Sequence, residues 1–168
     1  IWGFPVTAIV PVIGEEILNL SDVSLGLLVS TEGAGALVSA LMIAIYGRPR
    51  HFRGLYFYGV FLYLNMVLWF ASSTNPWLSG ALLCVMGLGG AAFAAMQATL
   101  AFLQADPEYR SRVMGVVTMC IGTGPLGFAH LGLLADAIGA PLATAVMAVE
   151  GIIALLLVVI IWPEVVQP

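Results

Sequence analysis

The stretch Gly26–Gly54, GLLVSTEGAGALVSALMIAIYGRPRHFRG, is an apolar, small-residue run that contains one carboxylate, Glu32, and ends in a cluster of arginines. A helix needs about 20 apolar residues to cross a bilayer. A carboxylate inside such a helix is costly, whereas arginines directly after it are typical of a helix end at a membrane surface. The stretch therefore predicts a membrane-spanning helix with one ionisable group in its interior.

The composition of the whole chain also predicts a membrane protein. The 168 residues are 61% hydrophobic and 8% charged, with a mean hydropathy of +1.07. A soluble domain is roughly 25% charged, and a water-soluble fold of this length could not hide so much apolar surface. Because the chain begins at Ile1, without an initiator methionine and inside a hydrophobic run, we expect a fragment or a crop of a longer protein.

Proline residues and polar clusters divide the chain into six apolar runs that are long enough to span a bilayer. In hydrocarbon only helices and closed barrels satisfy their own backbone hydrogen bonds, and these runs are too long for barrel strands. We therefore expect one all-α, polytopic transmembrane domain over residues 1–168, with six helices at about 1–19, 24–46, 55–72, 77–103, 112–135 and 141–162.

The basic residues fix the expected orientation. The chain has five arginines and no lysine, and all five fall in two loops that strict alternation places on one side of the membrane. The positive-inside rule makes that side cytoplasmic, so both termini are expected in the cytoplasm as well. The residues that anchor this topology are Arg48, Arg50, Arg53, Arg110 and Arg112.

Small residues indicate how the helices pack, because helices in lipid associate through close backbone approach. Runs 24–46, 77–103 and 112–135 are rich in glycine and alanine and are expected to lie inside or at interfaces, whereas the bulkier runs 55–72 and 141–162 are expected to face lipid. Pro125, preceded by Gly124, predicts a kink in the fifth helix. The kink either relieves packing or helps a cavity to open and close.

Several motifs resemble the major facilitator superfamily, most closely its transmembrane secretion effector branch of enterobactin and macrolide exporters. The resemblance covers essentially the whole chain and is carried by Val10-Pro11-Val12-Ile13, Leu25-Gly26-Leu27-Leu28, Gly33-Ala34-Gly35-Ala36-Leu37, Arg110-Ser111-Arg112-Val113-Met114-Gly115 and Gly132-Leu133-Leu134-Ala135-Asp136. It implies the C-terminal half of a twelve-helix transporter, built as a three-plus-three inverted repeat.

The chain departs from this family pattern at three places. Ser111 replaces a glycine, and Glu32 stands where the family usually has a small or apolar residue. Gly124-Pro125-Leu126-Gly127 only partly matches the antiporter motif, which the family carries in its N-terminal half. The resemblance is therefore specific to the superfamily and weak for the substrate.

Polar residues inside the expected spans are the candidates for function. Glu32 could carry a proton at bilayer depth, or it could be a protonated hydrogen-bonding or snorkelling residue. His130 could share a proton with a carboxylate, and Gln97 is a candidate hydrogen-bonding residue for transport or proton coupling, although packing roles are the alternatives for both. Glu150 lies midway along the last helix, which the resemblance makes peripheral, so we expect less of it.

These features favour half of a secondary transporter in a bacterial plasma membrane, with proton-coupled efflux of a small amphipathic molecule such as a drug or siderophore. Its expected partners are the bilayer, that substrate and the missing N-terminal half. The alternative is a non-transporting helical membrane module, or a degenerate fragment that binds a partner subunit. Metalloprotease, rhomboid and phosphate-loop motifs are absent, so neither an enzyme, a cofactor, a metal site nor nucleic-acid binding is expected.

Overall fold

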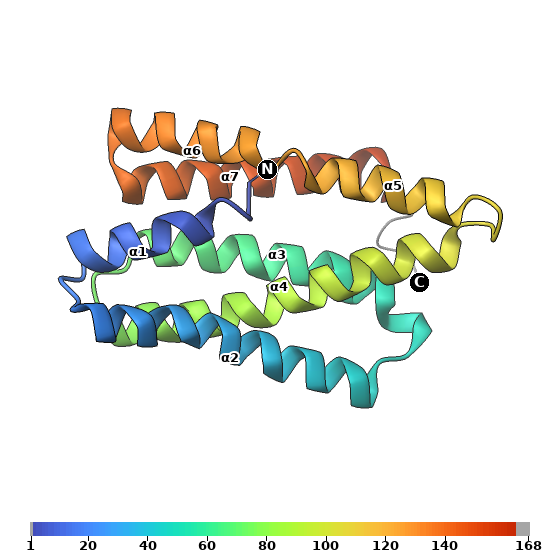
Figure 1. The fold of residues 1–168 in the computed structure, drawn as a ribbon, viewed down its shortest axis with the longest axis horizontal. Helices are drawn as coiled ribbons and strands as arrows, with labels where there is room; N and C mark the ends of the chain where they lie inside the picture. The colour runs from blue at the N-terminus through green and yellow to red at the C-terminus, as the bar shows by residue number, and fades with distance from the viewer. Residues whose placement is uncertain (1, 164–168) are drawn as a thin grey trace.

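The computed structural model describes residues 2–163 and is helical throughout, without strands in that range (Figure 1). The predicted all-α fold is confirmed. Residue 1 and residues 164–168 of the predicted domain lie outside the described range. The helices are α1 (Val6–Glu16), α2 (Asp22–Tyr46), the 3-10 helix η1 (Pro49–His51), α3 (Phe52–Ala71), α4 (Pro76–Gln104), α5 (Arg110–Ile121), α6 (Gly124–Ile138) and α7 (Ala140–Ile161).

Within the described residues, five helical segments are long and apolar enough to cross a membrane. They are α2, η1 with α3, α4, α5 with α6, and α7. Their bounds lie within a few residues of the expected runs, since the proline residues and polar clusters do end helices in a chain this apolar. Asn75, for example, caps α4 by accepting hydrogen bonds from the backbone amides of Trp77 and Leu78.

The run expected at about 1–19 forms a shorter helix within the described residues. The helix α1 has 11 residues, which corresponds to about 16 Å, and it is not among the segments long enough to span a membrane by length alone. Pro5 disfavours helical backbone at the preceding residue, so the helix starts only at Val6. At the other end the chain leaves the helix through a turn in which Asn19 adopts a left-handed conformation, with φ of 50°.

The expected single helix over 112–135 is two helices, α5 and α6, separated by Gly122 and Thr123. Pro125 lies in the first turn of α6. Its ring has no amide hydrogen and collides with the carbonyl group four residues earlier, which belongs to Ile121, the last residue of α5. The bend expected at Gly124 and Pro125 is therefore present, while a role for it in gating remains a prediction.

The helices form a row in which α4 packs against both α2 and α3, and α3 packs in turn against α7. The helix α6 lies beside α7, and α1 contacts α2 and α7 (Figure 1). The helix α3 lies between α4 and α7 and buries Leu64, Val67 and Phe70. Its residues Tyr58, Phe61 and Trp69 stay exposed, so part of the run expected to face lipid is open and part is covered. The helix α5 buries no residue against this chain, and the inner or interfacial place expected for its run stays a prediction.

Glycines bring the backbones of neighbouring helices into direct contact. A Cβ atom on Gly35 of α2 would overlap the carbonyl oxygen of Cys84 in α4, and one on Gly87 of α4 would overlap that of Glu32 in α2. Between α3 and α4 the contact is reciprocal: a Cβ on Gly59 would lie 2.8 Å from the Gly89 oxygen, and one on Gly89 would lie 2.7 Å from the Gly59 oxygen. Such contacts supply the packing that the hydrophobic effect cannot supply in lipid.

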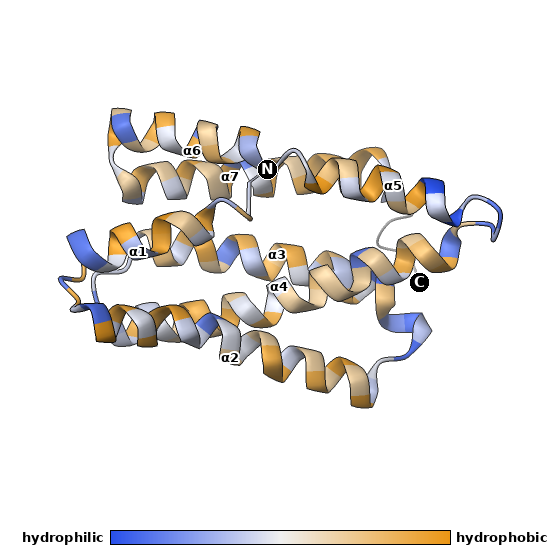
Figure 2. Cartoon of the chain, viewed as in Figure 1, coloured by the Kyte–Doolittle hydropathy of each residue, from blue (hydrophilic) through white to orange (hydrophobic). Residues whose placement is uncertain are grey.

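Both arginine-bearing connections, between α2 and α3 and between α4 and α5, lie at the same end of the bundle, as the alternation predicts (Figure 2). Two of the arginines stack on aromatic rings there. The guanidinium carbon of Arg110 lies 4.5 Å from the centre of the Phe102 ring, and that of Arg112 lies 5.6 Å from the centre of the Tyr109 ring. This end is therefore the polar, basic end of the bundle.

Replacing Gly35 by alanine should destabilise the protein by about 1–3 kcal/mol, because the new methyl group collides with the backbone of α4. Gly33, on the same helix, is the matched control, since a Cβ there meets nothing within 4 Å. Gly33→Ala should keep or raise stability, because alanine favours a helix more than glycine does. Thermal unfolding of the detergent-solubilised protein measures both, and equal losses of stability would contradict this packing.

Candidate polar site in the membrane

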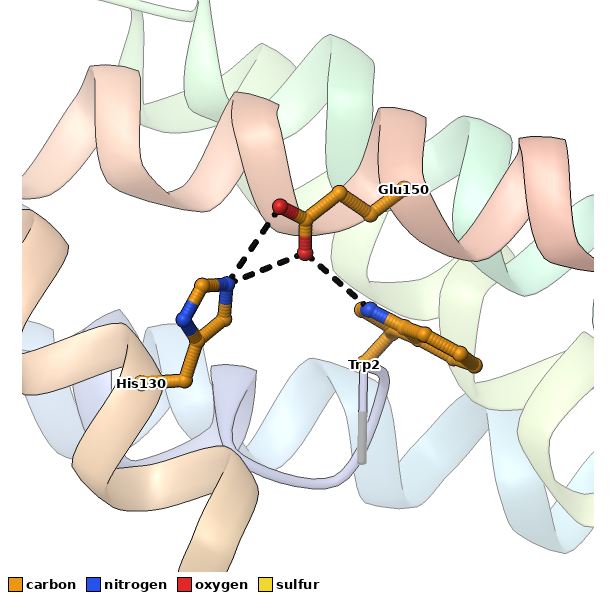
Figure 3. Close-up of polar contacts among 3 residues, drawn as sticks. All are labelled: Trp2, His130 and Glu150. Carbon is orange, nitrogen blue, oxygen red and sulfur yellow. Dashed lines mark hydrogen bonds and ion pairs between the residues drawn. The ribbon is translucent and has the colours of Figure 1, made fainter.

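Three polar side chains from separate parts of the chain meet inside the membrane-spanning region (Figure 3). His130 comes from α6, Glu150 from α7 and Trp2 from the segment before α1. The Nε2 atom of His130 lies 3.0 Å from Oε2 and 3.3 Å from Oε1 of Glu150. The indole Nε1 of Trp2 donates a hydrogen bond of 3.1 Å to the same Oε2 atom. One carboxyl group thus joins three elements.

The turn at Gly139 brings His130 and Glu150 to the same level. Gly139 has φ of +83°, a left-handed conformation that glycine tolerates, and it ends α6 and starts α7 directly. His130 lies nine residues before this turn and Glu150 eleven residues after it. At 1.5 Å per residue they lie about 14 Å and about 16 Å from the turn, so their side chains meet across the antiparallel pair.

A second glycine makes room for Trp2. A Cβ atom on Gly151 would lie 3.1 Å from the Cβ of Trp2 and 2.8 Å from a methyl carbon of Leu64. Because the position after Glu150 has no side chain, the segment before α1 can approach α7 and place the indole N–H on the carboxyl group. Two glycines therefore position the three side chains. The left-handed turn at Gly139 sets His130 opposite Glu150, and the close approach at Gly151 admits Trp2.

The site lies near the middle of its helix and is open on one side. Glu150 is about 15 Å from either end of α7, which is close to the centre of a hydrocarbon core. The side chains of His130 and Glu150 are 42% and 37% exposed. An ionisable pair at that depth normally faces a partner or a water-filled cavity, since contact with acyl chains is costly. The open side is therefore a surface that something other than lipid is expected to cover.

A second polar group lies at the same level on the other side of the bundle. Glu32 is half-buried and lies ten residues into α2. The Tyr63 hydroxyl donates a 3.2 Å hydrogen bond to the carbonyl oxygen of Gly3, the residue after Trp2. The start of α2 and the Gly139 turn share one end of the bundle (Figure 1), so Glu32 and Glu150 lie at about equal depth.

We name these five side chains the polar layer. It runs across the bundle from α2 through α3 and the segment before α1 to α7 and α6, and it consists of Glu32, Tyr63, Trp2, Glu150 and His130. Polar side chains inside a bilayer are less costly when they lie at one depth and pair with one another, because scattered polar groups would each lack partners.

The sequence-predicted candidates do not all meet. His130 lies beside Glu150 rather than Glu32. Gln97 lies toward the arginine end of α4, about 10 Å before its last residue, and its side chain makes no hydrogen bond to another of residues 2–163. Two other polar residues of the spanning helices bond within their own helix, as Asn65 does to the carbonyl oxygen of Phe61 and Thr118 does to that of Met114.

Glu150, of which less was expected, is central to this contact, and Trp2 was not among the candidate site residues. A signal for Glu150 exists, because His130 and Glu150 are spaced almost evenly about Gly139 and would therefore face each other in a helical hairpin. No comparable signal points to Trp2, whose contact with Glu150 depends on the tertiary placement of the first segment. Among residues 2–163 no cluster of histidine, cysteine or acidic side chains suits a metal ion.

Comparison with known proteins places the sequence in a family. The family model described as Major Facilitator Superfamily matches residues 2–168. No match was found among curated proteins or among solved structures.

Proposed function

The chain belongs to the major facilitator superfamily, and from that membership we propose that it forms the C-terminal six-helix half of a proton-coupled exporter. Members of this superfamily are membrane transporters and not enzymes, so the chain is part of a multi-pass transport protein. The polar layer is the observation that carries the coupling part of the proposal. It places two carboxyl groups and an imidazole at mid-membrane depth, where a transporter exchanges protons.

The helix contacts support a half-transporter built from two inverted repeats. In such an arrangement α1, α2 and α3 form the first repeat, and α4, the pair α5 with α6, and α7 form the second. The contact of α1 with α2 then corresponds to the contact of α4 with α5. Likewise the contact of α3 with α4 corresponds to that of α7 with α1, and the contact of α3 with α7 corresponds to itself. These three correspondences agree with a three-plus-three arrangement, whereas the contacts of α2 with α4 and of α6 with α7 lack counterparts of similar extent.

The uncovered surfaces support a missing second half. The helix α5 buries no residue in this chain, and α6 buries only Gly124, Gly127 and Leu131 among its residues. A Cβ at Gly115 of α5 or at Gly132 of α6 would meet nothing within 4 Å. Small residues on uncovered helix faces are what close helix packing in a membrane requires. The second half would also cover the open side of His130 and Glu150.

The proposed substrate is a small amphipathic organic molecule that leaves the cytoplasm as protons enter. The resemblance of the helix-start motifs to an exporter branch supports this direction, and the apolar composition with few interior charges supports the substrate class. The proposed location is a bacterial plasma membrane, with the arginine end in the cytoplasm.

Glu32→Gln in the complete transporter should remove the pH dependence of efflux, because the amide is permanently neutral and cannot release a proton. In proteoliposomes the wild-type protein should export faster under an inward proton gradient, and the variant should export at the gradient-free rate. Glu16→Gln is the matched control, because Glu16 is exposed at the end of α1. Gradient-driven efflux that persists in Glu32→Gln would make Glu32 a structural hydrogen-bonding residue.

A wild-type protein that exports nothing would instead favour a non-transporting membrane module. Loss of insertion in Glu32→Gln, measured by membrane fractionation, would show a packing role for this residue.

Cysteine labelling tests the orientation. In a background with Cys84→Ala and Cys120→Ala, Arg50→Cys should react with a membrane-impermeant maleimide only after the cytoplasmic face is opened. Thr74→Cys, in the exposed connection between α3 and α4, should react in intact cells. The reverse labelling pattern would contradict the cytoplasmic assignment of the arginine end.

A further inference from the structure

We propose that His130 and Glu150 together bind a single transported proton, and that Trp2 is a positioning residue that holds the Glu150 carboxyl group in place. This inference rests on the proposed function, because it names the site at which a proton-coupled exporter loads its proton. It assigns that role to a pair on α6 and α7, the last two helices of the chain, and not to Glu32 alone.

Charge balance makes the pair a one-proton site. With one proton the pair is neutral overall, either as imidazolium with carboxylate or as imidazole with carboxylic acid. Without that proton it carries one negative charge, and with a second proton it carries one positive charge. A net charge at the bilayer centre is costly, so the pair retains one proton while it is closed to water. It releases the proton when a water-filled path stabilises the charged form.

The geometry lets the proton move without rearrangement. His130 Nε2 lies within hydrogen-bond distance of both Glu150 oxygens, at 3.0 Å and 3.3 Å. A protonated imidazole donates across this contact to the carboxylate, and a protonated carboxyl group donates back across it to the neutral imidazole. Both forms therefore fit the same heavy-atom positions, and the proton crosses between nitrogen and oxygen over one short contact.

Trp2 cannot compete for the proton. The indole N–H is a donor only, so it serves Oε2 of Glu150 in either protonation state. The indole is itself fixed by the close approach to Gly151, and the adjoining Gly3 carbonyl accepts a hydrogen bond from Tyr63. The carboxyl group is thereby held at one orientation toward His130, and the indole lies where its fluorescence senses the charge of the pair.

No other ionisable side chain on the elements packed around the pair, among residues 2–163, has a hydrogen bond to His130 or Glu150. Tyr63 is connected to the pair through Gly3 and Trp2. Asp136 lies six residues from His130, about 9 Å along α6, on the far side from the break. The ionisable side chains on the packed elements α1, α3, α6 and α7, besides the pair, are Glu15, Glu16, Arg53, Tyr56, Tyr58, Tyr63 and Asp136.

The test uses protons alone as the ligand and Trp2 as the reporter, in the complete transporter in lipid nanodiscs. The difference in tryptophan emission between the wild-type protein and Trp2→Phe isolates the Trp2 signal. We expect this signal to change with pH in one step, because an imidazolium quenches a neighbouring indole. The step should be lost in His130→Gln, which has no imidazole, and it should move to lower pH in Glu150→Gln, where the imidazolium has lost its anionic partner. It should persist unchanged in the control Glu16→Gln. A Trp2 signal that titrates unchanged in both pair variants would overturn the inference.

A flux assay separates this inference from the proposed function. Glu150→Gln is neutral in every state and mimics the proton-loaded pair, so gradient-driven export should be lost while gradient-free substrate exchange continues. If the wild-type protein is gradient-driven and Glu150→Gln is equally so, the inference fails and the proposed function stands. If the wild-type Trp2 signal titrates but export ignores the gradient, the proposed function fails and the proton is not transported.

The variants are expected to fold, since glutamine can accept from Trp2 and donate to His130. Size-exclusion profiles check this directly. Should Glu150→Gln fail to fold, His130→Gln decides alone, because it removes the titrating imidazole while leaving the carboxyl group and its bond to Trp2.

Discussion

The direct contact between the backbones of α2 and α4 is the constraint on which the rest of the structure depends. In lipid, apolar side chains gain nothing by leaving one hydrocarbon surface for another, so helices associate where their backbones can touch. The backbones of α2 and α4 touch where Gly35 meets Cys84 and where Gly87 meets Glu32. The backbones of α3 and α4 touch where Gly59 meets Gly89. The crossing also fixes where Glu32 lies, because its own carbonyl group is part of the contact.

A second set of backbone features places the other half of the polar layer. The left-handed turn at Gly139 sets His130 opposite Glu150, and the absent side chain at Gly151 admits Trp2. The two arrangements meet where Tyr63 donates to the carbonyl of Gly3. Polar groups that would be costly one by one in hydrocarbon are therefore gathered at one depth, which is the arrangement that a transporter of the major facilitator superfamily can use.

Much of the fold follows from the sequence because composition and helix breakers act locally. Segments α2, α3, α4 and α7 follow from apolar runs between breakers, and the break before α6 follows from the collision of Pro125 with Ile121. The short α1 depends on a turn at Asn19 that no periodicity announces. The burial of one face of α3 depends on which glycines face each other, and side-chain bulk does not predict which face is covered. The Trp2–Glu150 bond joins residues 148 positions apart, so only the tertiary structure reveals it.

Cross-linking between α2 and α4 in native membranes tests the central contact most directly. A Cβ atom on Gly80 would lie 3.7 Å from a methyl carbon of Thr31, so the pair Thr31→Cys with Gly80→Cys, in a background lacking Cys84 and Cys120, is within reach of a disulfide. The account predicts that a mild oxidant joins this pair within one chain and leaves Gly33→Cys with Gly80→Cys unjoined. Equal cross-linking of the two pairs, or none in the first, would contradict it.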